Sequence, residues 1–153
     1  WVVAGAPAVG VLAWMFFAWP VVVDRTPDHR EYRWAREHLR TMPPECAVAY
    51  LPFAGKRVVR LPTYAGPARE VVDARRSGDV VAALARARCL YYAHTSLCST
   101  AEGRPDCEAI ERRLALAPID RASFPAPRAH ETFGYEGDTV EVWIARVERM
   151  TGD

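Results

Sequence analysis

The sequence lacks two polar residue types altogether, because none of its 153 residues is asparagine or glutamine. Lysine is almost absent as well, since Lys56 is the one lysine among 20 basic residues. With abundant alanine, this pattern is typical of a GC-rich coding bias, so the many arginines carry less functional information than usual. The formal net charge of only +1 argues against nucleic acid as a general partner. We therefore expect no nucleic-acid partner.

The sequence motifs of several enzyme classes are also missing. The AGK tripeptide at 54–56 is not a phosphate-binding loop, because Tyr50 stands where the first glycine is needed and Arg57 where serine or threonine is needed. There is no G-x-S-x-G elbow, no H-E-x-x-H pair and no dinucleotide fingerprint. The acidic side chains from Asp106 to Glu111 lie near a predicted helix start, where the helix dipole alone explains them. The residues alone name no reaction, and we predict no catalytic residue and no bound cofactor.

Charge is absent from residues 1–23, although 25% of the chain as a whole is charged. As a helix this segment would be about 34 Å long, against about 30 Å of bilayer hydrocarbon. Trp1 and Trp19 lie near its ends, and small residues four apart would let another helix approach closely. We expect residues 1–23 to be a transmembrane helix, the last span of a longer protein, with membrane lipid and neighbouring helices of the same protein as partners. A cleaved signal peptide and a buried helix of a soluble protein are the alternatives.

The remaining residues have the size of one ordinary domain, expected at 28–153 after a short linker at 24–27. Arg25 and Arg30 follow the apolar segment closely and are candidates for contact with lipid headgroup phosphates. A solvated helix beside the membrane explains the same two arginines without any lipid contact.

The cysteines indicate the side of the membrane on which this domain lies. Cys98 and Cys107 bracket a polar, turn-rich loop that a disulfide could close. Because disulfides persist in oxidising compartments, this pair favours the extracytoplasmic, periplasmic side of a bacterial cytoplasmic membrane. The arginines that follow residue 24 favour the cytoplasm instead, but long domains are translocated largely regardless of flanking charge.

Two other roles for the cysteines remain open, a zinc site and a second disulfide. Cys89, His94, Cys98 and Cys107 lie close enough in sequence for a tetrahedral zinc site, but they lack a C-x-x-C pair. A second disulfide between Cys46 and Cys89 is disfavoured, because bonded geometry between neighbouring parallel strands is uncommon.

The pattern of apolar residues predicts an α/β domain. A helix is expected at 27–41, followed by strands at 46–52 and 57–61. Helical material at 66–87 with a break near residues 77–78, a strand at 88–94 and a helix at 105–114 follow along the chain. Two closing strands are expected at 116–124 and 139–147. This order implies an α/β sandwich whose sheet is mostly parallel with an antiparallel edge.

Four stretches after the apolar segment carry a family resemblance. They are HREYRWAREHLRTMPPECAVAYLP at 29–52, CLYYAHTSLC at 89–98, EGRPDCEAIERRLALAPI at 102–119 and TVEVWIARVER at 139–149. Their layout resembles the C-terminal region of bacterial multi-pass glycosyltransferases of the GT-C class, which are similar to protein mannosyltransferases and to the aminoarabinose transferase of lipid A.

The resemblance implies metal-assisted or carboxylate-assisted transfer of a sugar from a polyprenyl-phosphate donor to an acceptor outside the cytoplasmic membrane. The acidic catalytic residues of that class lie in early extracytoplasmic loops, and no position here matches them. The terminal domain would therefore be non-catalytic by itself and would help to choose the acceptor, while any divalent metal would belong to the parent enzyme. The competing hypothesis is a binding or sensor domain anchored by a single span.

Overall fold

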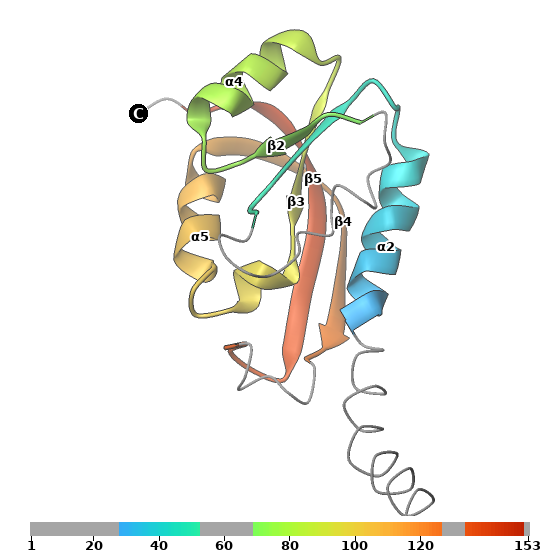
Figure 1. Ribbon diagram of the computed structural model, residues 1–153, viewed down its shortest axis with the longest axis vertical. Helices are drawn as coiled ribbons and strands as arrows, with labels where there is room; N and C mark the ends of the chain where they lie inside the picture. The colour runs from blue at the N-terminus through green and yellow to red at the C-terminus, as the bar shows by residue number, and fades with distance from the viewer. Residues whose placement is uncertain (1–27, 53–68, 127–133, 152–153) are drawn as a thin grey trace, which may run out of the picture.

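The computed structural model describes residues 28–52, 69–126 and 134–151, which form one five-stranded sheet with helices on both faces (Figure 1). In chain order the elements are α2 (Asp28–Thr41), β1 (Ala47–Tyr50), β2 (Val71–Asp73), α4 (Ser77–Arg86), β3 (Leu90–His94), the 3₁₀ helix η1 (Ser96–Ser99), α5 (Arg104–Arg112), β4 (Leu114–Pro125) and β5 (Thr139–Met150). Helix α2 covers one face of the sheet, and α4 and α5 lie against the other.

The sheet is mixed, with the strand order β2-β1-β3-β5-β4. Strand β1 pairs in parallel with β2 and β3, whereas β5 runs antiparallel to both β3 and β4. The prediction of a mostly parallel sheet with an antiparallel edge is therefore wrong. Strand β5 lies between β3 and β4 in the sheet. The two longest strands, β4 and β5, have 12 residues each and form an antiparallel ribbon that extends well beyond the parallel part.

The predicted fold also included a transmembrane helix, and this part is corrected as well. Within 28–52, 69–126 and 134–151, no helix has both the length and the apolar character needed to cross a membrane. The longest of them, α2, has 14 residues and would be about 21 Å long, short of the roughly 30 Å of bilayer hydrocarbon. Residues 1–23, to which the span was assigned, and the linker at 24–27 with Arg25 lie outside the described residues.

Helix α2 ends where the sequence predicts, at Thr41 just before Pro43 and Pro44. Its apolar side places Leu39 and Met42 against β1, β3 and β5. Arg69 closes the end of this helix, because its guanidinium donates hydrogen bonds to the carbonyl oxygens of Leu39 (2.8 Å) and Met42 (3.1 Å). Burial lowers the pKa of Arg69, and the electrostatic effects of Tyr91 and Glu45, which raise it, offset this only in part.

The stretch from Val71 to Asp73 is a strand, although the sequence predicted helical material at 66–87. Val71 and Val72 are β-branched and pair in parallel with Val48 and Ala49 of β1, so tertiary pairing outweighs the local helical pattern. Helix α4 begins at Ser77, where the sequence predicted a break. The strand predicted at 57–61 lies outside the described residues.

The core on the other face of the sheet lies beneath α4 and α5. Val80 and Ala83 of α4 and Ile110 of α5 are buried against a sheet surface that includes Leu90 and Tyr92 of β3. Along β5, every second side chain from Val140 to Ile144 is buried, as the predicted alternation requires. The predicted alternation is therefore confirmed, and the two closing strands pair with each other in antiparallel fashion.

Two disulfides connect the described elements, and all four cysteines are paired. Cys98 in η1 is bonded to Cys107 in α5, with their Cα atoms 5.6 Å apart, and this is the pair that the sequence favours. Cys46 is bonded to Cys89, the bridge that the sequence disfavours, with their Cα atoms 4.6 Å apart. These two residues directly precede the adjacent strands β1 and β3, and the amide of Ala47 donates a hydrogen bond to the Cys89 carbonyl (2.9 Å).

Candidate functional site

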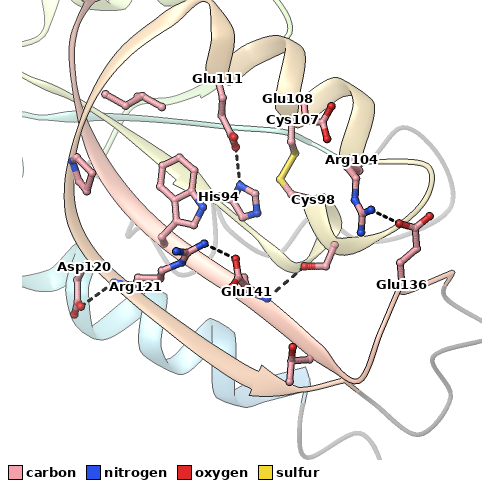
Figure 2. A pocket seen from close by; sticks show the side chains of 15 residues that line it. His94, Cys98, Arg104, Cys107, Glu108, Glu111, Asp120, Arg121, Glu136 and Glu141 are labelled. Carbon is pink, nitrogen blue, oxygen red and sulfur yellow. Dashed lines mark hydrogen bonds and ion pairs between the residues drawn. A yellow bond between two sulfur atoms is a disulfide. The ribbon is translucent and has the colours of Figure 1, made fainter.

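A pocket with a volume of about 640 Å³ opens between α5, η1 and the β4–β5 ribbon (Figure 2). This volume is in the range expected for a small-molecule site. Residues of α5 and of the long antiparallel strands β4 and β5 line the pocket, so it lies on the face of the sheet that α5 covers. Side chains of β3, η1, α5, β4 and β5 and of Glu136, just before β5, therefore contribute to one cavity.

Strand β5 forms one wall of the pocket because its side chains alternate between the two faces of the sheet. Thr139, Glu141 and Trp143 line the pocket, while the intervening Val140 and Val142 are buried on the other side. Strand β4 adds Asp120 and Arg121, just after a register shift between Pro118 and Asp120. Such irregularities re-aim side chains next to binding sites.

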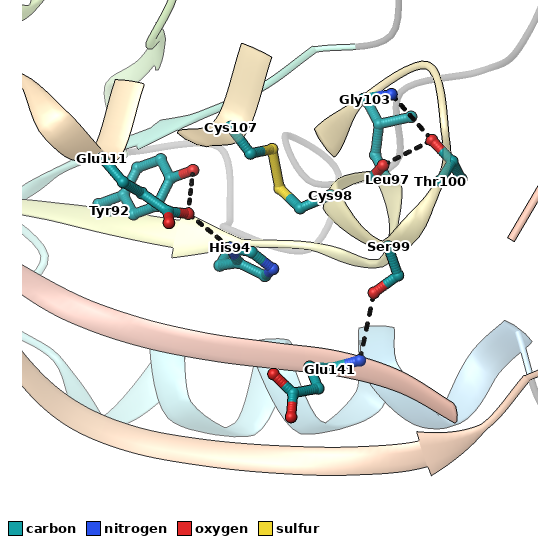
Figure 3. Close-up of a disulfide and its surroundings, with 10 residues drawn as sticks. All are labelled: Tyr92, His94, Leu97, Cys98, Ser99, Thr100, Gly103, Cys107, Glu111 and Glu141. Atoms are coloured by element: carbon teal, nitrogen blue, oxygen red, sulfur yellow. Dashed lines mark hydrogen bonds and ion pairs between the residues drawn. A yellow bond between two sulfur atoms is a disulfide. The ribbon is translucent and has the colours of Figure 1, made fainter. Parts of the chain in front are cut away.

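One polar group in the lining is a pair formed by His94, at the end of β3, and Glu111 of α5. The Nδ1 atom of His94 lies 2.6 Å from Oε1 of Glu111, and the hydroxyl of Tyr92 donates to the same oxygen (3.2 Å; Figure 3). Since a carboxylate only accepts, Nδ1 of His94 carries the proton, which leaves Nε2 as an acceptor in the neutral ring. Burial, together with the charge of Glu111, raises the pKa of Tyr92, so this hydroxyl remains a donor.

Aromatic rings back this polar pair. The indole of Trp143 stacks on the imidazole of His94, with ring centroids 4.9 Å apart and planes 19° from parallel. The ring of Tyr92 meets the same indole edge to face at 5.3 Å. Edge and stacked contacts of this kind hold aromatic rings in fixed orientations. Trp143 therefore presents a pre-positioned surface in the pocket wall.

Charged side chains surround the opening. Those that line the pocket are Arg104, Glu108, Glu111, Asp120, Arg121, Glu136 and Glu141. Arg104 forms an ion pair with Glu136, and Arg121 forms one with Glu141 across the ribbon. Asp120 lies 2.6 Å from Nε2 of His38 in α2. Because the Asp120 carboxylate is paired with α2, four carboxylates remain beside two guanidinium groups, which still gives the lining an excess of negative charge.

The disulfide between Cys98 and Cys107 forms part of the pocket wall and is held by a tight turn (Figure 3). The hydroxyl of Thr100 donates to the carbonyl oxygen of Leu97 (2.7 Å) and accepts a hydrogen bond from the amide of Gly103 (3.0 Å). Gly103 is required here, because a Cβ atom at this position would clash with the carbonyl oxygen of Leu97. The turn therefore fixes the start of α5 relative to η1.

The residues singled out from the sequence have different positions in the structure. Cys98 and Cys107 lie in the pocket, and Arg30 is exposed on α2, away from it. Of the group weighed as a zinc site, Cys89 is bonded to Cys46, while His94 and Cys98 come together with Glu111.

Sequence reasoning missed the residues that give the pocket its character. In the sequence the helix dipole alone explains Glu111, and no motif singles out Glu141 and Trp143. One signal was present, because β5 carries a charged and an aromatic side chain on the face opposite its apolar residues. Two faces of one strand that both carry large side chains indicate a binding surface beside a core.

No family model, curated protein or solved structure matches the chain. The chemistry of the pocket is therefore the basis for a functional conclusion. Guanidinium groups and the hydroxyl of Thr139 supply hydrogen-bond donors, carboxylates supply strong acceptors, and Trp143 supplies an aromatic surface. Such a lining suits a ligand with many hydroxyl groups and a positively charged group.

Proposed function

We propose that this chain is an extracytoplasmic binding domain, non-catalytic by itself, in the C-terminal part of a bacterial polyprenyl-phosphate-sugar-dependent glycosyltransferase. Its pocket would hold the saccharide part of the acceptor. The observation that carries the proposal is the 640 Å³ pocket with Trp143 in its wall and four carboxylates around it. The resemblance of the sequence to the GT-C class supplies the enzyme type.

The charge of the pocket supports the acceptor rather than the donor as its ligand. A polyprenyl-phosphate sugar carries negative charge next to the sugar, and the carboxylates that outnumber the guanidinium groups would repel it. An acceptor saccharide without phosphate would not be repelled by these carboxylates. An amino group on the saccharide would be favoured further, because it would pair with Glu141 or with Glu108 at the opening.

The hydrogen-bonding groups support a saccharide over an apolar ligand. Carboxylates accept hydrogen bonds from adjacent hydroxyl groups, and arginine donates several bonds in a fixed geometry. The ion pairs of Arg104 with Glu136 and of Arg121 with Glu141 hold these groups in place before a ligand arrives. The apolar face of a sugar ring would pack against Trp143.

The disulfides support the extracytoplasmic location. Both bonds join residues that are fixed by the sheet or by α5, and one of them forms part of the pocket wall. Bonds of this kind persist in oxidising compartments. After mild reduction, a membrane-impermeant thiol reagent should label Cys98 and Cys107 to the same extent in intact and in lysed cells, because both are equally buried in either case. Labelling that occurs only after lysis would contradict the location.

Binding is tested by calorimetric titration of the full chain, with both disulfides intact, against a chitosan trisaccharide and its N-acetylated form. We expect the amino form to bind at least about tenfold more tightly, and the difference to shrink at high salt. Glu141→Gln should weaken binding of the amino form. The control is Glu148→Gln, on the same strand but outside the pocket, which should leave binding unchanged.

The enzyme assignment is tested separately, in membranes that contain the parent protein. Glu141→Gln should raise the KM for acceptor and leave the KM for the polyprenyl-phosphate donor unchanged, because the pocket contacts the acceptor alone. A membrane fraction that binds the trisaccharide but transfers no sugar would support a binding or sensor domain instead.

A further inference from the structure

Three potential metal ligands from separate elements meet beside the pocket. His94 at the end of β3, Cys98 of η1 and Glu111 of α5 each place one ligand atom within 4.8 Å of the other two. The sulfur of Cys107 is bonded to that of Cys98, so a fourth candidate lies next to them. Figure 3 shows these side chains directed toward one another around the disulfide. Among the described residues, this is the one such cluster of three or more.

We propose that reduction of the Cys98–Cys107 disulfide converts this cluster into a tetrahedral zinc site. The two thiolates, the imidazole of His94 and the carboxylate of Glu111 would be its four ligands. Zinc is bound by cysteine sulfur, histidine nitrogen and carboxylate oxygen in tetrahedral sites. In the disulfide the two sulfurs are neutral and are not zinc ligands, because metal binding requires thiolates. The disulfide and the zinc site are therefore alternative states of the same four residues.

The distance between His94 and Glu111 is close to the one needed for zinc, whereas Cys107 lies outside the group within 4.8 Å and its sulfur would have to move toward it. In a tetrahedral site, nitrogen and oxygen ligands lie about 3.3 Å apart and two thiolate sulfurs about 3.8 Å apart. His94 and Glu111 are now in contact at 2.6 Å, so these two atoms would separate by less than about 1 Å. The Cα atoms of the cysteines, 5.6 Å apart, allow the sulfurs to separate by side-chain rotation. The turn at Gly103 keeps η1 and α5 adjacent in either state.

The surroundings of the cluster favour a cation. The two cysteines are almost fully buried, whereas 27% of the Glu111 side chain is exposed, so the cluster opens toward the pocket. The negative excess of the pocket lining would raise the local concentration of a divalent cation. Cys46 and Cys89, in contrast, are not part of any cluster of three potential ligands among the described residues.

The conversion requires two electrons from a dithiol reductant. The reductant's two thiols become a disulfide, while the sulfur–sulfur bond between Cys98 and Cys107 breaks and two protein thiols form. Binding of Zn²⁺ then displaces one proton from each thiol, and the proton on Nδ1 of His94 moves through solvent to Nε2, so that Nδ1 can bind the metal. Neither step uses a saccharide, so this inference stands independently of the proposed function.

The experiment uses the full chain with Cys46→Ser and Cys89→Ser, so that one disulfide alone can be reduced. Co²⁺ is added to the oxidised and to the phosphine-reduced protein, and absorption spectra are recorded. We expect the reduced protein to bind one Co²⁺, with a thiolate-to-cobalt charge-transfer band and the visible bands of tetrahedral cobalt, and to release it to Zn²⁺. The oxidised protein should show neither band. His94→Ala should weaken metal binding at least about tenfold.

If the serine variant does not fold, the reduced wild-type chain is compared with Cys98→Ser/Cys107→Ser, which keeps the other pair. Tetrahedral cobalt bands in the wild-type chain that are lost in this variant support the site. Equal spectra for the two proteins, no thiolate band in the reduced wild-type chain at micromolar Co²⁺, or unchanged binding by His94→Ala would overturn it.

Discussion

The imidazole of His94 lies 2.6 Å from a carboxylate oxygen of Glu111, and this contact joins the end of β3 to α5 in the lining of the pocket. The same oxygen accepts a hydrogen bond from Tyr92, whose side chain is fully buried. Glu111 thus belongs both to the packing of the core and to the pocket.

Replacement of Glu111 by alanine should destabilise the protein by about 1–3 kcal/mol, because it leaves the buried hydroxyl of Tyr92 without a partner. Urea unfolding of the full chain measures this change. Glu108→Ala, on the exposed side of the same helix, is the control and should change stability by less than about 0.5 kcal/mol. In a Tyr92→Phe background the cost of Glu111→Ala should fall, and an equal cost in both backgrounds would contradict the shared hydrogen bond.

Gly103→Ala should be strongly destabilising, because the added Cβ would clash with the Leu97 carbonyl and lie 2.8 Å from the Leu97 side chain. We expect a loss of at least about 1–3 kcal/mol in the free energy of unfolding. Gly78→Ala is the matched control, since its Cβ meets nothing within 4 Å and the residue lies in helix α4. That change should stabilise the protein by about 0.5–1 kcal/mol. Similar thermal midpoints for the two variants would show that the turn is not tight.

The stability contribution of Asp73 should depend on pH. Burial opposes ionisation of this carboxyl, but hydrogen bonds and charges from Arg75 and Arg76 outweigh it and hold the pKa below its usual value of 3.8. A lowered folded-state pKa means that the contribution is fully present above about pH 5 and is lost as the pH falls through the folded-state value. Asp73→Asn should therefore cost about 0.5–1.5 kcal/mol at pH 7.

Unfolding of wild type and Asp73→Asn is compared between pH 7 and pH 2. The difference in unfolding free energy should shrink steadily below pH 4. A difference that stays constant over this range would mean that the charge of Asp73 is not the source of the stabilisation.

Loss of the Cys46–Cys89 disulfide should destabilise the chain more than loss of the Cys98–Cys107 disulfide. The two bonds span 43 and 9 residues, and a longer loop constrains the unfolded chain more strongly. The chain-entropy relation gives about 4 kcal/mol for the longer loop and about 2.7 kcal/mol for the shorter one. Denaturant unfolding of the two double-serine variants tests the order, and the reverse order would indicate that strain or residual structure dominates.

Sequence patterns predict the elements of this fold where local chemistry is decisive. The spacing of Ala35, Leu39 and Met42 with the prolines that follow indicates α2, and the alternation from Val140 to Ile144 indicates β5. The strand at Val71–Asp73 is missed because it has three residues beside an alanine-rich helix, and pairing with β1 determines its conformation. The position of β5 between β3 and β4 depends on pairing between segments that are far apart in the sequence, so no local pattern predicts it.

The candidate site is predictable only in part for the same reason. Cys98 and Cys107 bracket a short polar loop, so their pairing is a local inference. His94, Glu111 and Trp143 come together only because α5 returns along the sheet and β5 pairs with β3. Their convergence follows from the topology, which the sequence analysis predicted incorrectly.

Nuclear magnetic resonance of the isotopically labelled full chain, titrated with the chitosan trisaccharide, tests the pocket as the binding site most directly. We predict shifts of the backbone amides of His94, Glu111, Glu141 and Trp143 and of the indole N–H of Trp143, with little change along α2. No shifts at millimolar ligand, or shifts centred on α2 and away from the pocket, would contradict the proposal.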